Sequence, residues 1–244
     1  WLNNNTDITQ INWNSLYHTN YLNNVANPDG SAKYVLEQRH NDLVETTFNS
    51  TYSNRFNKWV NMLAGIDVNY SIGKHYKTMN DLLGGKQWID IDQFAERDFS
   101  DNNMIIQNDL RNPNRKIYEG DRFGYDYNMN VIKAGAFIQG NLSLTKFDIS
   151  AAFRLSTTSF WREGKMENGR AAVIGATSYG KGKVLNFVDP SGKIGVTYKI
   201  NGRHRLVLNG LAETRAPYAG YAYVAPRVKD TQIGKVIINP KNPR

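Results

Sequence analysis

Acidic side chains alternate along one long stretch of the chain that is rich in Asp, Asn and Gly. Asp90 and Asp92 follow Trp88 in this pattern, and Glu96 and Asp98 repeat it. In an extended segment each pair would lie on one side, and paired carboxylates can serve as general acid and base in glycoside cleavage. Nothing in the sequence orients a substrate around them, so we expect a ligand-contacting or structural loop and no catalytic residues. A calcium site needs several convergent oxygens, and this spacing fits no recognised loop, so we expect no metal.

A second set of side chains combines aromatic rings with arginine. Flat rings beside a guanidinium suit sugars, flat chelates or carboxylate ligands, although packing within loops would use the same residues. The four histidines have no metal-ligand spacing, and no phosphate-binding fingerprint is present, so no cofactor is expected. The candidate ligand-binding residues are Trp88, Asp90, Asp92, Trp161, Arg162, Tyr218, Tyr221, Tyr223 and Arg227.

Composition narrows the class of protein. The chain has 244 residues, 40% of them hydrophobic, and a formal net charge of +8. It has no cysteine, which excludes disulfides and thiolate metal sites within it. No run of eighteen apolar residues is present, which excludes a transmembrane helix. The charge permits anionic partners, but no RNA- or DNA-binding motif accompanies it, so we expect no nucleic acid.

Strict alternation is the strongest structural signal. Between Trp59 and Ile72 one face carries Val60, Met62, Ala64, Ile66, Val68, Tyr70 and Ile72. Such a run indicates a strand with one apolar face. The same pattern predicts strands over 33–53, 125–139, 147–160, 193–200 and 205–212. An amphipathic helix is expected around 9–23, and Asn201-Gly202 predicts a two-residue type I′ hairpin turn.

The connections between these strands alternate between short and long. The short ones are 54–57, 140–146 and 201–202, and the long ones within the sheet are 73–124 and 162–192. In an antiparallel meander every tight turn then lies at one end of the sheet and every long loop at the other. Further long loops are expected at 1–32 and 216–235. Outer-membrane β-barrels have this asymmetry.

Strand length favours a transmembrane barrel over a soluble β-sandwich. Sandwich strands have a mode of about 5–6 residues, whereas several here run past twelve. Six strands cannot close a pore-sized barrel, because small closed barrels need about eight. We therefore expect an all-β, antiparallel up-and-down barrel, of which residues 1–244 are a fragment.

Several stretches add a family resemblance. They are AKYVLEQRHNDLVETTFNSTYSNRFNKW, HYKTMNDLLGGKQWIDIDQFAERD, IIQNDLRNPNRKIYEGDRFGYDY and VTYKINGRHRLVLNGLAETRAP. Together they resemble the β-barrel of TonB-dependent outer-membrane receptors, in the branch whose plug follows a carboxypeptidase-regulatory-like domain. The resemblance implies a mid-barrel fragment without the plug and N-terminal domains.

The resemblance also implies a function. Such receptors sit in the outer membrane of Gram-negative bacteria and capture a scarce nutrient: a siderophore, glycan, peptide or vitamin. The TonB–ExbB–ExbD system would drive import through the plug. Outer-membrane lipid, lipopolysaccharide and a surface lipoprotein are further expected partners. The alternatives are a passive porin or adhesin barrel and a soluble carbohydrate-binding β-protein.

Overall fold

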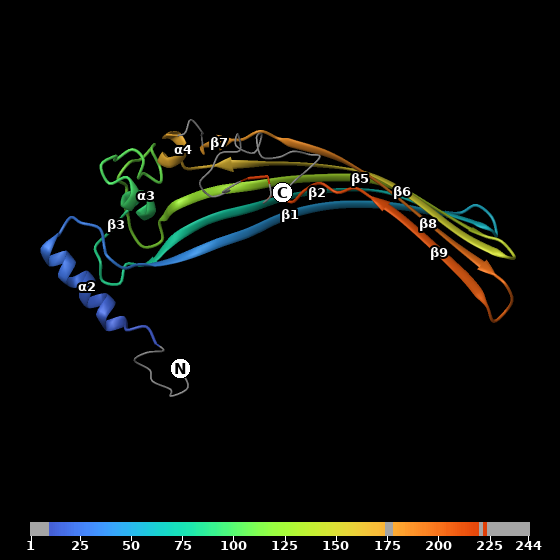
Figure 1. Cartoon of the computed structure of the whole chain (residues 1–244), viewed down its shortest axis with the longest axis horizontal. Helices are drawn as coiled ribbons and strands as arrows, with labels where there is room; N and C mark the ends of the chain where they lie inside the picture. The colour runs from blue at the N-terminus through green and yellow to red at the C-terminus, as the bar shows by residue number, and fades with distance from the viewer. Residues whose placement is uncertain (1–9, 174–177, 220–221, 224–244) are drawn as a thin grey trace.

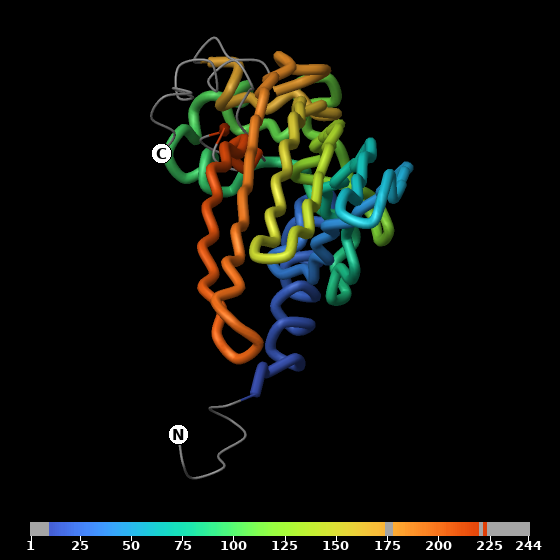
Figure 2. The backbone as a smooth tube through the Cα atoms, turned by 90° about the vertical axis from the view of Figure 1, so that its right-hand side faces the viewer, coloured from blue at the N-terminus to red at the C-terminus, as the bar shows by residue number. Residues whose placement is uncertain are grey.

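The computed structural model describes residues 10–173, 178–219 and 222–223. Six long strands form its sheet: β1 (Leu36–Arg55), β2 (Val60–Asp81), β5 (Arg122–Ser143), β6 (Phe147–Gly164), β8 (Leu185–Lys199) and β9 (Arg205–Glu213). They lie in chain order, β1-β2-β5-β6-β8-β9, and each neighbouring pair is antiparallel. Figures 1 and 2 show the strands side by side in this order. The predicted all-β, up-and-down antiparallel architecture is confirmed. Within the described residues the sheet is open, with β1 and β9 at its edges.

Shorter elements occupy the connections. Helix α2 spans Trp13–Ala26, and the loop between β2 and β5 contains β3 (Trp88–Ile89), α3 (Gln93–Asp98) and β4 (Lys116–Ile117). The loop between β6 and β8 contains α4 (Gly169–Val173) and β7 (Gly180–Lys181), which pairs with β6. In the described residues, no helix is both long and apolar enough to cross a membrane.

The alternation of short and long connections is confirmed, but several predicted bounds were wrong. β2 continues to Asp81 and β8 begins at Leu185, so the long loops are 82–121 and 165–184 in place of 73–124 and 162–192. The ladder between β1 and β2 continues through His40 and Tyr76 to Leu36 and Asp81. After Ile72 the side chains of β2 are mostly polar, so the apolar alternation stops there. The backbone pairing with β1 nevertheless continues to Asp81. The predicted loop 1–32 contains α2, and residues 216–219 of the predicted loop 216–235 contain no strand.

The turn between β8 and β9 also differs from its prediction. Lys199 pairs with Arg205, which leaves a five-residue loop, and neither Asn201 nor Gly202 has a positive φ. The Asn201 side chain Oδ1 instead accepts hydrogen bonds from the backbone N–H groups of Arg203 and His204, both at 2.9 Å. An Asx-type turn therefore replaces the predicted type I′ turn, because the asparagine side chain satisfies the backbone locally.

Register places the apolar positions of all six strands on one face, which we call the apolar face. One row across the sheet consists of Tyr52, Ala64, Ile138, Phe153, Gly192 and Ala212. Many large side chains on this face are exposed, among them Phe48, Ile66, Val68, Leu155, Ile194, Leu206 and Leu208. Nothing in the described chain covers this surface.

The opposite face, which we call the polar face, carries charged and hydroxyl side chains held by cross-strand contacts. Arg154 on β6 pairs with Asp67 on β2 at 2.8 Å, and Lys199 pairs with Asp148 at 2.7 Å. Near the long loops this face becomes aromatic, with Tyr127, Met129 and Phe160 buried. The two faces of the sheet therefore differ in chemistry along most of its length.

All long loops lie at one end of the sheet and all tight turns at the other, and α2 projects from the loop end (Figure 1). Asn20, fully buried, fixes α2 there. Its Nδ2 donates to the carbonyl oxygens of Tyr34 and Leu82 at 2.8 and 2.9 Å, and its Oδ1 accepts from Lys33 N at 2.8 Å. A single polar side chain thus joins the helix to the segment just before β1 and to the first long loop.

Candidate functional site

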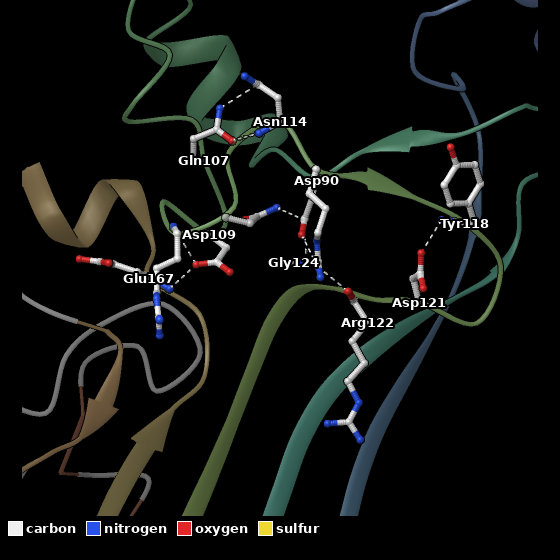
Figure 3. Close-up of polar contacts among 12 residues, drawn as sticks. Asp90, Gln107, Asp109, Asn114, Tyr118, Asp121, Arg122, Gly124 and Glu167 are labelled. Carbon is white, nitrogen blue, oxygen red and sulfur yellow. Dashed lines mark hydrogen bonds and ion pairs between the residues drawn. The ribbon is translucent and has the colours of Figure 1, made fainter.

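Asp90 is the centre of the first long loop. The residue is 2% exposed, and its Oδ1 accepts hydrogen bonds from Asn108 Nδ2 and from the backbone N–H of Gly124, each at 2.9 Å. Its Oδ2 lies 2.8 Å from Arg115 Nη2. Figure 3 shows these contacts converging on Asp90. Because protein donors occupy both oxygens, we assign Asp90 a positioning role in place of the predicted ligand contact.

Asp92 has a similar role at the start of α3. Its Oδ1 accepts from the backbone N–H groups of Phe94 and Ala95 at 3.0 and 3.2 Å, which makes it the N-cap of this short helix. Its Oδ2 lies 3.7 Å from Arg170 in the second long loop. Asp92 therefore orients α3 and carries an ionic contact between the two loops.

The two long loops are joined by backbone hydrogen bonds as well. Leu110 N donates to Glu167 O at 2.7 Å, and Gly169 N donates to Gln107 O at 2.9 Å. Glu167 N also donates to Asp109 Oδ1 at 3.1 Å (Figure 3). A Cβ added at Gly169 would lie 2.0 Å from Met104 O, so the approach depends on glycine. The loops consequently form one connected cap at this end of the sheet.

The second predicted acidic pair, Glu96 and Asp98, is exposed. Glu96 and Asp98 lie on α3, and the Arg97 guanidinium, which hydrogen-bonds Asp98 at 2.8 Å, holds the pKa of that carboxyl below its usual value. A general acid at neutral pH needs the opposite shift. Among the described residues, no group of three or more His, Asp or Glu side chains lies close enough to hold a metal ion.

A cleft of about 420 Å³ opens between the first long loop and the loop ends of β1, β2 and β5; we call it the Trp88 cleft. The buried rings of Trp88 and Phe123 line it, together with the exposed rings of Tyr34 and Phe94. Charged and amide side chains complete the lining, Asp92 and Asn108 among them. Of the predicted residues, Trp88 and Asp92 are brought together here.

An ion-pair network supports one wall of the Trp88 cleft. Lys77 Nζ lies 2.7 Å from Glu37 Oε2 and 4.3 Å from the centroid of the Phe123 ring. The other oxygen of Glu37 accepts from Arg39 Nε at 2.6 Å. Gly124, at φ +75°, makes room for Lys77, because a Cβ there would lie 2.1 Å from Lys77 Cε. Lys77 is therefore held over an aromatic floor by a carboxylate.

The predicted pair Trp161 and Arg162 is divided between the two faces of β6, since successive strand residues point to opposite sides. Arg162 is buried on the polar face, where it donates to Ser178 O at 2.7 Å and lies over the Tyr127 ring at 4.8 Å. Trp161 is half-buried on the apolar face, with Lys181 Nζ 4.6 Å from its ring centroid. Neither residue lines the Trp88 cleft.

Of the predicted residues after β9, the structure describes Tyr218 and Tyr223, which lie in different places. Tyr218 is exposed and lines a cleft of about 600 Å³ on the polar face, together with Lys133 and Asp189. Tyr223 is buried in the aromatic cluster that contains Tyr127 and Phe160. Two further predicted residues, Tyr221 and Arg227, lie outside the described residues. The structure thus divides the predicted set among several places.

Sequence reasoning missed the basic and acidic wall of the Trp88 cleft. Glu37, Arg39 and Lys77 fall at the ends of strands where apolar alternation has stopped. All three residues are odd-numbered and so continue the polar face of β1 and β2. This continuation of the polar face is the sequence signal that could have located them. For Lys77 this signal is weak, because residues 73–81 lack apolar alternation and fall within the predicted loop 73–124, whereas Glu37 and Arg39 lie in the predicted strand 33–53.

Comparisons with known proteins identify no relatives: no family model, curated protein or solved structure matches the chain.

Proposed function

We propose that this chain is part of the membrane-spanning β-barrel of an outer-membrane TonB-dependent transporter, which captures a scarce nutrient and imports it into the periplasm. The exposed apolar face carries the proposal. Six adjacent strands present Val, Ile, Leu and Phe side chains on one continuous surface, and their opposite faces carry mostly charged, amide and hydroxyl side chains, with Leu43, Val207 and Leu211 as exposed apolar exceptions. Apolar-out and polar-in alternation is the pattern of transmembrane barrels.

Strand length and aromatic placement support this proposal. β2 has 22 residues, against the ~9–11 tilted residues that span a bilayer, so it would extend beyond the membrane on the loop side. On the apolar face, Phe147 and Tyr198 stack at 5.0 Å near the turn end. Tyr70 and Trp161 lie nearer the loops, as in the interfacial belts of membrane proteins.

Capture and import would be divided between the two ends of the sheet. The joined loops and the Trp88 cleft lie at the end that would face the exterior, where ligand arrives. The polar face would line the path inward, and the TonB–ExbB–ExbD system would supply energy through a plug. Lipopolysaccharide and outer-membrane lipid would cover the apolar face, and a surface lipoprotein could dock on the loops.

Single cysteines test the membrane assignment, since this chain has none of its own. We would introduce Val68→Cys on the apolar face or Asn69→Cys, its neighbour on the polar face, into the full-length protein freed of any other cysteine. In isolated outer membranes we expect a lipid-confined maleimide to label Val68→Cys and a water-soluble maleimide to label Asn69→Cys. Equal labelling of both positions by the water-soluble reagent would refute the proposal.

Energy coupling needs a separate test, because a passive porin or adhesin would show the same labelling. Cells that depend on the protein for a nutrient should lose uptake when TonB is deleted, at unchanged amounts of the protein in the outer membrane. Uptake that persists without TonB would favour the porin.

A further inference from the structure

The Trp88 cleft has more cations than anions. Lys33, Arg39 and Lys77 line it with Glu37 and Asp92, three positive groups against two negative ones, an excess of one. Both acids are held by the protein: Glu37 by two of these cations, and Asp92 by the backbone of α3. Because Lys77 and the Nε of Arg39 both contact Glu37, the donors that remain for a ligand are the Lys33 ammonium and the terminal nitrogens of Arg39.

Arg39 presents two donors to the cleft. Its Nε donates to Glu37 at 2.6 Å, and in the described part of the chain neither terminal nitrogen has a hydrogen-bond or ion-pair partner. The side chain is 62% exposed. Glu37 anchors one side of the guanidinium, which leaves a planar pair of N–H donors oriented by an existing contact. Such a pair matches the two oxygens of a carboxylate.

Aromatic rings lie in the same cleft. Tyr34 and Phe94 are exposed at its rim, 47% and 69%, while Trp88 and Phe123 are buried in its wall. Exposed rings of this kind pack against flat, apolar faces of ligands, and polar groups beside them fix the orientation. The volume of about 420 Å³ falls within the ~300–1,000 Å³ typical of small-molecule sites.

We propose that the Trp88 cleft binds an acidic sugar, with the sugar carboxylate on Arg39 and the apolar face of the ring on Phe94, the more exposed of the two rings at the rim. A uronic acid combines both features in one ring, whereas a neutral sugar would offer no anion to Lys33 or to the terminal nitrogens of Arg39. This inference rests on the proposed function, because it names the ligand of a cleft on the capture side.

The test measures binding to the purified full-length protein in detergent by calorimetry. The probes are a galacturonic acid trisaccharide and the matched neutral galactose trisaccharide. We expect the acidic probe to bind at least tenfold more tightly. Arg39→Gln should remove about tenfold of that affinity, the effect of one charge-assisted contact, and leave the neutral probe unchanged. Phe94→Ala should weaken both probes.

Arg203→Gln is the matched control, since Arg203 is an exposed arginine in the turn at the far end of the sheet. It should bind both probes as the parent does, and unchanged circular dichroism should show that each variant is folded. Equal affinity for the two probes, no binding of either, or an Arg39→Gln variant with parental affinity would each overturn the inference. The proposed transporter function would still stand or fall on cysteine labelling and TonB dependence.

Discussion

The guanidinium of Arg154 on β6 lies 2.8 Å from the carboxylate of Asp67 on β2, and it reaches across β5 at Gly135. A Cβ on Gly135 would lie 2.5 Å from Arg154 Nη2 and 3.3 Å from Asp67 Oδ1. The absence of a side chain on the middle strand is therefore what lets two non-adjacent strands form an ion pair. The contact ties three strands together on the polar face.

Gly135→Ala should weaken this ion pair and cost about 0.5–1 kcal/mol of unfolding free energy, a small value because both charged side chains are partly exposed. The added methyl group displaces the guanidinium. In an Asp67→Asn background the same substitution should cost less, since the pair is already lost. Urea unfolding of the full-length protein in micelles measures all four variants of the cycle. Fully additive effects would mean that Gly135 does not act through the ion pair.

Asp90→Ala should loosen the first long loop. Its removal leaves Arg115, Asn108 and the Gly124 N–H without their shared acceptor in a buried site, at a cost of about 1–3 kcal/mol per unsatisfied group. We expect faster amide exchange and proteolysis in residues 82–121. Asp98→Ala removes an exposed carboxylate from the same loop and should change neither. An unchanged exchange pattern in Asp90→Ala would contradict the positioning role.

Gly169→Ala should separate the two long loops, because its Cβ would lie 2.0 Å from a backbone carbonyl that cannot move aside as a flexible side chain can. Amide exchange at position 169 and at Leu110, which donate the two backbone-to-backbone hydrogen bonds described between the loops, should accelerate. Gly192→Ala is the control, with its nearest neighbouring atom 3.8 Å away. Equal exchange rates in the two variants would show that the close approach of the loops does not depend on glycine at position 169.

Ile66→Arg should destabilise the membrane-inserted protein by ~2–4 kcal/mol if the apolar face meets the middle of the bilayer. Asn49→Arg, on the polar face of the adjacent strand, should be close to neutral. Folding into vesicles, followed by titration with denaturant, gives both values. A larger loss for Asn49→Arg than for Ile66→Arg would reverse the assignment of the faces.

Asn20→Asp should release α2 from the sheet. The substitution replaces an N–H donor by a carboxylate oxygen facing the carbonyl oxygens of Tyr34 and Leu82, inside a fully buried site. Amide exchange in α2 should rise by an order of magnitude or more. Asn14→Asp, an exposed substitution on the same helix, should leave exchange near the parental rate.

The sheet could be predicted in large part because its signal is local. Along Val60–Ile72 apolar residues alternate with mostly polar ones, so the type of each residue predicts the face of the sheet on which it lies. The tight turns follow from the short gaps between such alternating runs. Strand order and antiparallel pairing then follow from connection length. Prediction failed where residues 73–81 and 185–192 continue strands without clear apolar alternation, since backbone pairing there is maintained by the neighbouring strand.

The site could be predicted only in outline. The sequence by itself singled out Trp88 and Asp92 as residues of one long loop, and it determined the two-faced chemistry of the strands. Only the tertiary structure decided that Asp90 is a buried acceptor for the loop and that Trp161 and Arg162 lie on opposite faces. It also decided that Arg39 and Lys77, from different strands, share a cleft with Trp88. Alternation acts between neighbours in sequence, whereas burial, ion pairs and clefts depend on residues that meet only through folding.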